Sequence, residues 1–127
     1  MILVDTDVMI DLLRNLPQAV AWFGGLGDEV ILLPGYVAME LVQGCTSRAE
    51  LDALEQRISG AMIVWPDPQT CDGALAAYAR SRFSHGLGLL DALVGQLAVS
   101  LDQPLHTFNQ RHYASIRGLK TVQPYAR

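Results

Sequence analysis

Cysteine is scarce in this sequence, which contains Cys45 and Cys71 and no others. The two lie far apart, and neither belongs to a CxxC motif or stands beside a pair of histidines. A zinc knuckle or a disulfide framework is therefore not predicted, because both need regularly spaced cysteine or histidine residues. We expect both residues to be free, buried thiols.

Positive charge is scarce as well: nine Lys and Arg residues stand against 13 Asp and Glu residues, for a net charge of −4. This balance excludes the broad basic surface of a protein that binds phosphates by bulk electrostatics. Contact with nucleic acid would have to be local or mediated by a metal ion. The candidate phosphate contacts are Arg80, Arg82, Arg111 and Arg117, since a guanidinium matches phosphate geometry; the alternative for each is a solvated surface position.

Long hydrophobic runs are absent too. The longest, residues 87–101, is interrupted by Asp91 and Gln96 and is shorter than the roughly 20 residues that a membrane helix needs. No membrane segment is predicted. The opening MILVDTD has no basic region and reaches Asp5 before any apolar segment of signal-peptide length, so we expect no secretory signal and a cytoplasmic location.

Apolar residues are nevertheless plentiful, since half of the 127 residues are hydrophobic and 17% are charged. Without repeats or linkers, this composition predicts a single domain over residues 1–127. Short, continuous apolar runs predict buried parallel strands at residues 1–4, 30–33, 61–65 and 105–108, with a further edge strand at 121–124. The expected fold is a three-layer α/β/α domain with a central, mainly parallel sheet of four to five strands.

Segments of helical periodicity separate these runs. Apolar residues at helical spacing are Met9, Leu12, Leu13 and Leu16, then Leu51, Leu54 and Ile58, and later Leu90, Leu93, Val94, Leu97 and Leu101. Asp67 and Pro68 are predicted to open a helix through Leu75, Tyr78 and Ala79. The spacings of Trp22, Trp65, Tyr78 and Phe83 favour core positions over base-stacking positions. In such folds, ligands bind at the carboxyl ends of the strands.

Two acidic residues follow the first predicted strand. Asp5 stands at its carboxyl end, where a binding crevice is expected, and we interpret it as functional. Its alternative role is that of a helix N-cap, although Asp7 suits that role better. Both carboxylates remain candidates, with Asp5 favoured for chemistry.

Two further acids interrupt apolar helical segments. Glu40 has Tyr36, Val37 and Leu41 around it, so it needs either a cationic partner, such as Arg14, or a metal ion. Asp91 is the only charged residue in GLGLLDALVGQLAVS, near the expected start of a helix. The helix dipole would favour a negative charge there, but we interpret Asp91 as a metal ligand.

A cluster of Asp5, Glu40 and Asp91 would need a divalent cation to offset the mutual repulsion of the carboxylates. Oxygen ligands favour Mg²⁺, with Mn²⁺ as a substitute, over zinc. Two such ions about 3.5–4 Å apart can stabilise the attacking and leaving oxygens of a phosphodiester. The negative net charge therefore does not exclude a nuclease.

A polar cluster follows the last main strand. Thr107 and Asn109 are candidates to hydrogen-bond a carboxylate, a bound water or a phosphate, or else serve as turn formers. His112 is a candidate ligand, proton carrier or phosphate contact, or else a surface imidazole. We expect His85 and His106 to be structural.

Three motifs of the sequence together resemble those of PIN-domain ribonucleases, specifically VapC-type toxins of toxin–antitoxin systems. MILVDTDVMIDLLR resembles the first motif, with Asp5 as its acid and Asp7 where Asn or Ser is common. VAMELVQG resembles the second, with Glu40 as the acid. LLDALVGQLAVSLDQPLHTFNQRHY resembles the third and the turn that follows it, with Asp91 as the acid and Thr107 and Asn109 in the turn.

The resemblance implies a Mg²⁺-dependent endoribonuclease in which Asp5, Glu40 and Asp91 are catalytic residues and metal ligands, supported by Thr6, Asp7, Thr107, Asn109 and His112. A metal-activated water would hydrolyse RNA phosphodiester bonds. It also implies a homodimer and a cognate VapB-type antitoxin. One departure matters: His112 and Tyr113 stand where the family usually has Asp and Phe, so the fourth acid is missing or replaced.

Two alternatives follow from the same residues. Loss of the fourth acid would leave a PIN domain that binds an antitoxin or RNA without cutting it. Asp5-Thr6-Asp7-Val8 also resembles the nucleophile motif of haloacid-dehalogenase-like phosphatases, with Asp5 as a covalent nucleophile. Those enzymes need a Lys and a late acidic pair, and here the only Lys is Lys120.

Overall fold

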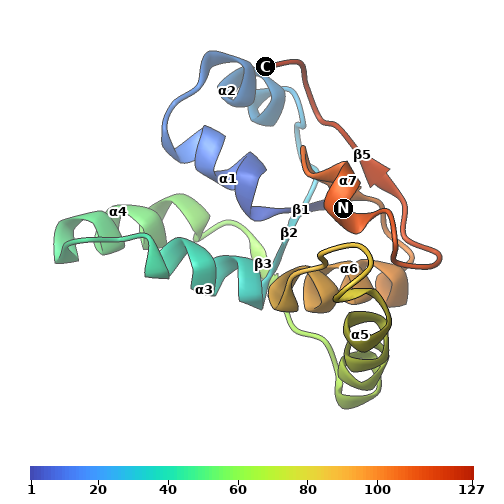
Figure 1. Cartoon of the computed structure of the whole chain (residues 1–127). Helices are drawn as coiled ribbons and strands as arrows, with labels where there is room; N and C mark the ends of the chain where they lie inside the picture. The colour runs from blue at the N-terminus through green and yellow to red at the C-terminus, as the bar shows by residue number, and fades with distance from the viewer.

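The computed structural model describes residues 1–127 as five strands and seven helices (Figure 1). The strands are β1 (Ile2–Val4), β2 (Ile31–Pro34), β3 (Met62–Val64), β4 (Leu105–His106) and β5 (Thr121–Val122). The helices are α1 (Thr6–Leu13), α2 (Pro17–Gly24), α3 (Gly35–Gln43), α4 (Arg48–Ile58), α5 (Pro68–Ser81), α6 (Leu89–Leu101) and α7 (Gln110–Tyr113).

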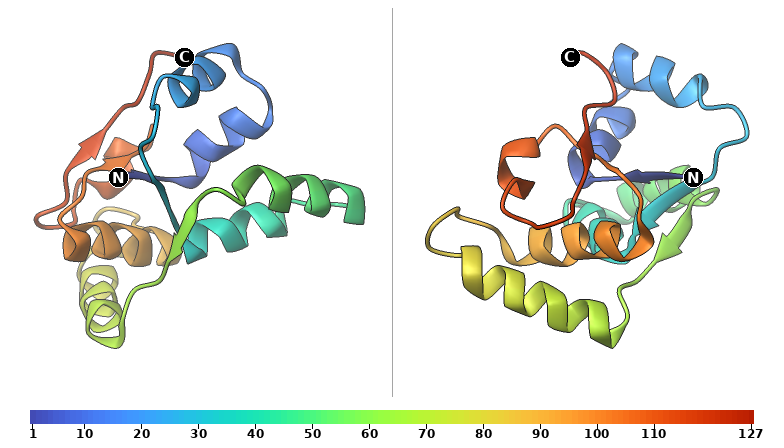
Figure 2. Two further views of the ribbon diagram at one scale, coloured as in Figure 1. Left: turned by 180° about the vertical axis from the view of Figure 1, so that it is seen from behind. Right: turned by 90° about the vertical axis from the view of Figure 1, so that its right-hand side faces the viewer.

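All five strands pair in parallel in one sheet, in the order β3-β2-β1-β4-β5. The first strand of the chain is therefore the central one: Leu3 is in register with Leu32 of β2 and with Leu105 of β4. The sheet lies between α1 and α2 on one side and α5 and α6 on the other (Figure 2). The predicted α/β fold with a parallel sheet of four to five strands is confirmed.

Continuous apolar runs form the central strands because helices cover both of their faces. Leu3, Val4 and Leu33 have no exposed surface and belong to a core cluster of 17 buried residues. The order of the strands also reverses beside β1, since the chain first builds outward to β3 and then returns to add β4 on the other side of β1. Ligands of parallel α/β folds bind at such a reversal, outside the carboxyl ends of the strands.

The helical pattern of residues 9–16 belongs to two helices, not one. Helix α1 ends at Leu13, Asn15 has a left-handed φ of 56°, and Leu16 is the N-cap of α2. Pro17 at the first position of α2 explains the break, because proline fits the start of a helix and restricts the residue before it. The predicted helix opened by Asp67 and Pro68 is confirmed, with the Asp67 side chain accepting from the Thr70 N–H at 2.8 Å.

Several residues predicted to be buried are exposed. Strand β3 lies at the edge of the sheet, and its Met62 and Ile63 are 52% and 40% exposed. Trp65, which follows it, is 55% exposed, and Phe83 is 92% exposed in the turn after α5. Periodicity does not reveal that a strand is at an edge or that a residue lies beyond the end of a helix, so the core prediction was wrong at Trp65 and Phe83.

The other expectations for single side chains are met in part. Trp22 and Tyr78 are partly buried and pack against the core, as predicted. Leu75 is 67% exposed, because α5 turns small side chains such as Ala74 and Ala77 inward. Cys45 and Cys71 are free but only partly buried. No helix of the structure combines the length and the hydropathy needed to span a bilayer.

Close packing between α6 and the segment after α7 depends on Gly95, where an added Cβ would overlap the Ile116 side chain and come within 3.3 Å of the Tyr113 ring. Ile116 is 4% exposed, so its Cδ1 would have to rotate within the core to make room. This contact fixes α7 against α6, and with it the position of Tyr113.

Replacing Gly95 with alanine should therefore destabilise the fold. Alanine favours a helix over glycine by up to about 1 kcal/mol, but overpacking at a buried contact costs about 1–3 kcal/mol. We expect Gly95→Ala to lower the free energy of unfolding by roughly 1–2 kcal/mol in urea denaturation. Gly24→Ala is the control, since nothing lies within 4 Å of a Cβ there and the variant should be no less stable than wild type. Equal stability of the two variants would contradict this packing.

Candidate active site

Asp5 lies where β1 ends and α1 begins. Its backbone N–H donates to the His106 carbonyl at 3.0 Å, which continues the pairing of β1 with β4 by one residue. Its side chain accepts from the Thr6 N–H at 2.8 Å and caps α1. The sequence analysis favoured Asp7 as the cap, but Asp5 takes this position because it is the last residue with extended backbone before the helix.

The Asp5 carboxylate is only 5% exposed and is held by residues from the far end of the chain. Thr107 Oγ1 and the Tyr113 hydroxyl both donate to Asp5 Oδ2, at 2.9 and 3.0 Å. Together with the Thr6 N–H, these donors satisfy the carboxylate without any cation. No Lys or Arg forms an ion pair with it.

Asp7 connects the start of α1 to the turn that follows β4. Its carboxylate accepts from the Phe108 N–H and from the Val8 N–H, both at 2.8 Å, and lies 3.4 Å from Thr107 Oγ1. The Asn109 N–H donates to Thr107 Oγ1 at 3.0 Å. Thr107 is therefore a turn former and a carboxylate partner at once, whereas Asn109 contributes through its backbone.

Asp91 reaches the site from the first turn of α6. Its Oδ1 lies 3.4 Å from the Tyr113 hydroxyl, the same group that donates to Asp5. Its Oδ2 lies 3.9 Å from His112 Nδ1, and both side chains are partly open to solvent, at 33% and 59% exposure. The predicted neighbourhood of Asp5, Asp91 and His112 is thus present.

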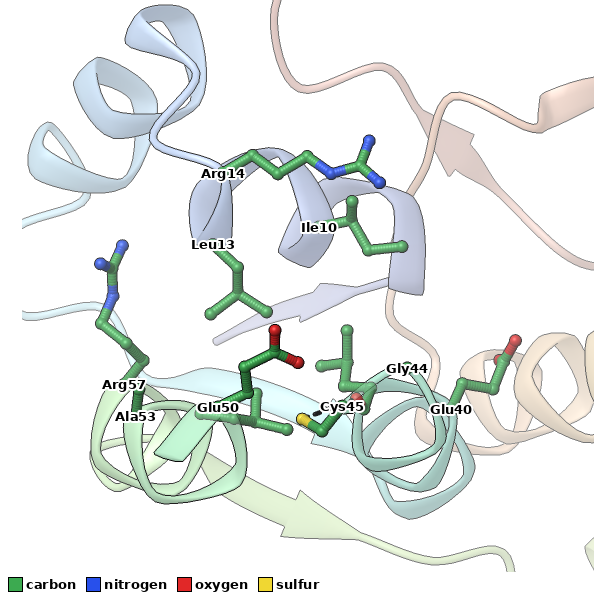
Figure 3. Close-up of a pocket in the computed structure, with 11 residues that line it drawn as sticks. Ile10, Leu13, Arg14, Glu40, Gly44, Cys45, Glu50, Ala53 and Arg57 are labelled. Atoms are coloured by element: carbon green, nitrogen blue, oxygen red, sulfur yellow. Dashed lines mark hydrogen bonds between the residues drawn. The ribbon is translucent and has the colours of Figure 1, made fainter. Parts of the chain in front are cut away.

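Glu40 joins the site through Thr6, whose hydroxyl donates to Glu40 Oε1 at 3.0 Å. The alternative partner, Arg14, forms no ion pair with Glu40, although both line the same groove between α1, α3 and α4 (Figure 3). A continuous path of polar contacts therefore runs from Glu40 through Thr6 to Asp5, and through Tyr113 to Asp91.

Burial and like charge dominate the electrostatics here. Burial, and then the nearby charge of Asp7, raise the pKa of the Asp5 carboxyl to about 6, against the lowering effect of its hydrogen bonds. Burial also raises the pKa of Asp7, while the backbone N–H groups and the cation of Arg127 lower it. The pKa of the Tyr113 hydroxyl is strongly raised by burial and by the Asp5 and Asp91 charges, so it remains a proton donor.

The donor set fits a hard divalent cation in its chemistry: carboxylate oxygens converge from β1, α3 and α6 on one end of the sheet, and none has a Lys or Arg partner. The carboxylates do not, however, form a group of three or more side chains arranged as around an ion. The Tyr113 hydroxyl lies between Asp5 and Asp91 instead. The assignment of Asp5, Glu40 and Asp91 as ligands stays a prediction.

Sequence reasoning missed the role of Tyr113, which it noted only as a departure from the family pattern. It also missed the last residues of the chain, where the Tyr125 hydroxyl and Arg127 Nε both bind Asp11 Oδ2, at 2.8 and 2.9 Å. The Arg127 guanidinium lies 4.0 Å from the centre of the Phe108 ring, next to Asp7. The spacing of polar residues gives no signal for contacts over such separations.

Other candidates take simpler positions. His106 is structural as predicted: its Nδ1 contacts the Leu3 carbonyl, its ring packs on Trp22, and burial lowers its pKa. His85 is exposed and contacts only the neighbouring Ser84 hydroxyl. The four candidate phosphate contacts, Arg80, Arg82, Arg111 and Arg117, are all exposed.

The fold and the site define a small parallel α/β domain whose carboxylates gather at the carboxyl end of the central strand. The sequence model of the PIN domain matches residues 2–118. The chain therefore belongs to the PIN-domain family, which confirms the resemblance seen in its three acidic motifs. A search of curated protein sequences finds no match.

Solved structures share the fold over nearly the whole chain. A toxin–antitoxin complex from Klebsiella pneumoniae contains a chain that is 21% identical, with full coverage of both chains and a TM-score of 0.80. VapBC-1 from nontypeable Haemophilus influenzae is 22% identical, with 98% of each chain covered and a TM-score of 0.78. VapBC2 from Rickettsia felis, bound to a promoter DNA fragment, is 17% identical, with 96% and 98% coverage and a TM-score of 0.78.

The raised pKa of Asp5 predicts a pH-dependent stability. Because the folded-state pKa of about 6 lies above the reference value of 3.8, the folded state binds the proton more tightly than the unfolded chain. The resulting stabilisation is fully present below pH 3.8 and is lost as the pH rises through about 6. It amounts to at most about 3 kcal/mol.

Asp5→Asn isolates this effect from the other carboxylates. In urea denaturation with EDTA between pH 4 and pH 7.5, we expect the stability of wild type to fall relative to that of Asp5→Asn as the pH rises. Parallel stability curves for the two proteins would show that the Asp5 pKa is not raised in the fold.

Proposed function

We propose that this PIN domain is an endoribonuclease that depends on Mg²⁺, or on Mn²⁺ as a substitute, and acts as the toxin of a toxin–antitoxin pair. The observation that carries the proposal is the convergence of Asp5, Glu40 and Asp91, from three separate elements, on the end of the sheet where the strand order reverses. Asp5 also caps α1, but that role does not explain why Glu40 and Asp91 lie nearby, and the mutual repulsion of the three acids favours a cation as their partner.

Within this proposal, Asp5 and Asp91 would hold the cation, with Glu40 beside them. A bound divalent cation supplies positive charge that lowers the pKa of water and stabilises the charge that develops on a phosphate during hydrolysis. Thr107 and the Thr6 N–H orient Asp5 by donating to its two oxygens, and the Thr6 hydroxyl orients Glu40. His112, 3.9 Å from Asp91 and exposed, is placed to contact a phosphate or carry a proton.

RNA as the substrate is supported by the segment that leads into α6. Residues 73–90 contain no acid, and the Arg82 guanidinium lies 5.1 Å from the centre of the exposed Phe83 ring. A cationic group beside an exposed aromatic ring suits a single-stranded nucleic acid, which offers phosphates and flat bases. Because the net charge of the chain is negative, contact with nucleic acid has to be local, and Arg82 and Phe83 offer such a local contact.

An antitoxin partner is supported by the names of the neighbouring structures, which are toxin–antitoxin complexes, and by a groove of about 480 Å³ between α1, α3 and α4. Apolar side chains such as Ile10 and Leu13 line it together with charged ones such as Arg14 and Glu50 (Figure 3). Because Glu40 also lines the groove, a VapB-type segment bound there would lie beside the acidic site.

The homodimer also remains a proposal. It is supported by exposed apolar side chains on two neighbouring elements, Met39 and Val42 on α3 and Met62 and Ile63 on β3. Burying them against a second copy would remove this apolar surface from water.

The two alternatives receive unequal support. A binding module without activity is favoured by the Tyr113 hydroxyl between Asp5 and Asp91, and it remains the second candidate. The phosphatase mechanism finds little support, since Asp5 is 5% exposed with all its hydrogen bonds internal, and Lys120 forms no ion pair with it.

Cleavage of total cellular RNA by the purified protein tests the proposal. We expect discrete fragments with Mg²⁺ or Mn²⁺ and none with EDTA, and we expect Asp91→Asn to lower the rate at least about 100-fold, because metal-assisted hydrolysis loses several kcal/mol with a ligand. Asp102→Asn is the matched control: it makes the same chemical change at the other end of α6, at an exposed left-handed position that Asn tolerates.

Folded wild-type protein that cuts no RNA with either metal would overturn the nuclease proposal and favour the binding module. Equal loss of activity in Asp91→Asn and Asp102→Asn would show that the effect comes from α6 as a whole and not from the Asp91 carboxylate.

A further inference from the structure

Tyr113 occupies an unusual position for a tyrosine, because its hydroxyl lies between two carboxylates. The side chain is 2% exposed, and the hydroxyl oxygen lies 3.0 Å from Asp5 Oδ2 and 3.4 Å from Asp91 Oδ1. A phenol carries a single proton and can donate to only one acceptor at a time. The shorter distance indicates that the hydroxyl donates its hydrogen bond to Asp5. Asp91 therefore lies near the hydroxyl without receiving a hydrogen bond from it.

The ring is held firmly, so the hydroxyl does not move aside freely. Tyr113 belongs to the buried core cluster, and its ring packs beside Gly95 of α6, where even an added methyl group would be in tight contact. The Ile116 N–H donates to the Tyr113 carbonyl at 3.1 Å and fixes the backbone. Helix α7 thus delivers one hydroxyl to a fixed point in the acidic site.

We propose that Tyr113 is a positioning residue that holds Asp5 in the metal-free protein and occupies the space between Asp5 and Asp91, so that its hydroxyl competes with a divalent cation. The inference rests on the proposed function, since it concerns the same carboxylates. The hydroxyl supplies one proton where a cation would supply two positive charges. It therefore stabilises the empty site and weakens the affinity of the site for the ion.

The proposal predicts opposite effects of one substitution. Tyr113→Phe removes only the hydroxyl and keeps the ring that fills the core. Without metal, Asp5 loses a donor, and the melting temperature in EDTA should fall by at least about 3 °C. With Mn²⁺ as the probe, the dissociation constant measured by isothermal titration calorimetry should become about 10- to 100-fold smaller, because the ion no longer displaces a hydrogen bond to a charged group.

Tyr125→Phe is the matched control. Its hydroxyl also donates to a carboxylate, Asp11, at 2.8 Å, but it lies outside the acidic site. We expect this variant to lose stability and to bind Mn²⁺ as wild type does. A role of Tyr113 in packing alone would lower stability without tightening the binding of Mn²⁺, so an unchanged or weaker affinity in Tyr113→Phe overturns the proposal.

A second measurement uses wild-type protein and does not depend on the folding of a variant. With tyrosines labelled with ¹³C at Cζ, saturation with Mg²⁺ should shift the Tyr113 resonance and leave that of Tyr125 in place. An unshifted Tyr113 resonance overturns the proposal.

The outcomes also separate this inference from the proposed function. Wild-type protein that binds Mn²⁺ and cuts RNA, with no gain in affinity in Tyr113→Phe, would contradict only the role of Tyr113. Absence of both Mn²⁺ binding and RNA cleavage in wild type and Tyr113→Phe would contradict the proposed function as well.

Discussion

A carboxylate at the end of a central strand is shielded from water by the elements on both sides of the sheet, so it must find its hydrogen-bond donors within the protein. Asp5 finds them in three places: the start of α1, the turn after β4 and the end of α7. The partners Thr107 and Tyr113 are 102 and 108 residues away in sequence. The hydrogen bonds to this one buried carboxylate thus connect the first and last parts of the chain at the site.

The sequence predicts best those features that burial enforces locally. Residues 1–4 and 30–33 are continuously apolar because helices cover both faces of β1 and β2. A continuous apolar run in the sequence therefore indicates a buried strand. Asp5 and Asp91 were identifiable because each is a charge next to such an apolar segment, and an apolar neighbourhood makes a charge costly unless it has a partner. Their closeness in space follows from the parallel sheet.

What the sequence leaves open depends on neighbours that are distant in the chain. Nothing in the spacing of residues 61–65 shows that β3 pairs on one side only, and so Trp65 and Met62 are more exposed than their hydrophobicity suggests. Tyr113 stood out only as a departure from the family pattern, and its hydrogen bond to Asp5 could not be predicted because that contact depends on how α7 packs on α6. Arg14, the alternative partner considered for Glu40, forms no ion pair with it, and the fold gives Glu40 a hydrogen bond from Thr6.

The central place of β1 in the sheet has a consequence for the order of events during synthesis. Strand β1 is synthesised well before one of its two neighbours, β4, and before the last donor to Asp5, Tyr113. Until those residues emerge, one edge of β1 is unpaired and Asp5 lacks two of its three donors. A chain that has not been synthesised as far as Tyr113 therefore has no assembled site, and any activity of this fold begins only after that residue has joined the fold.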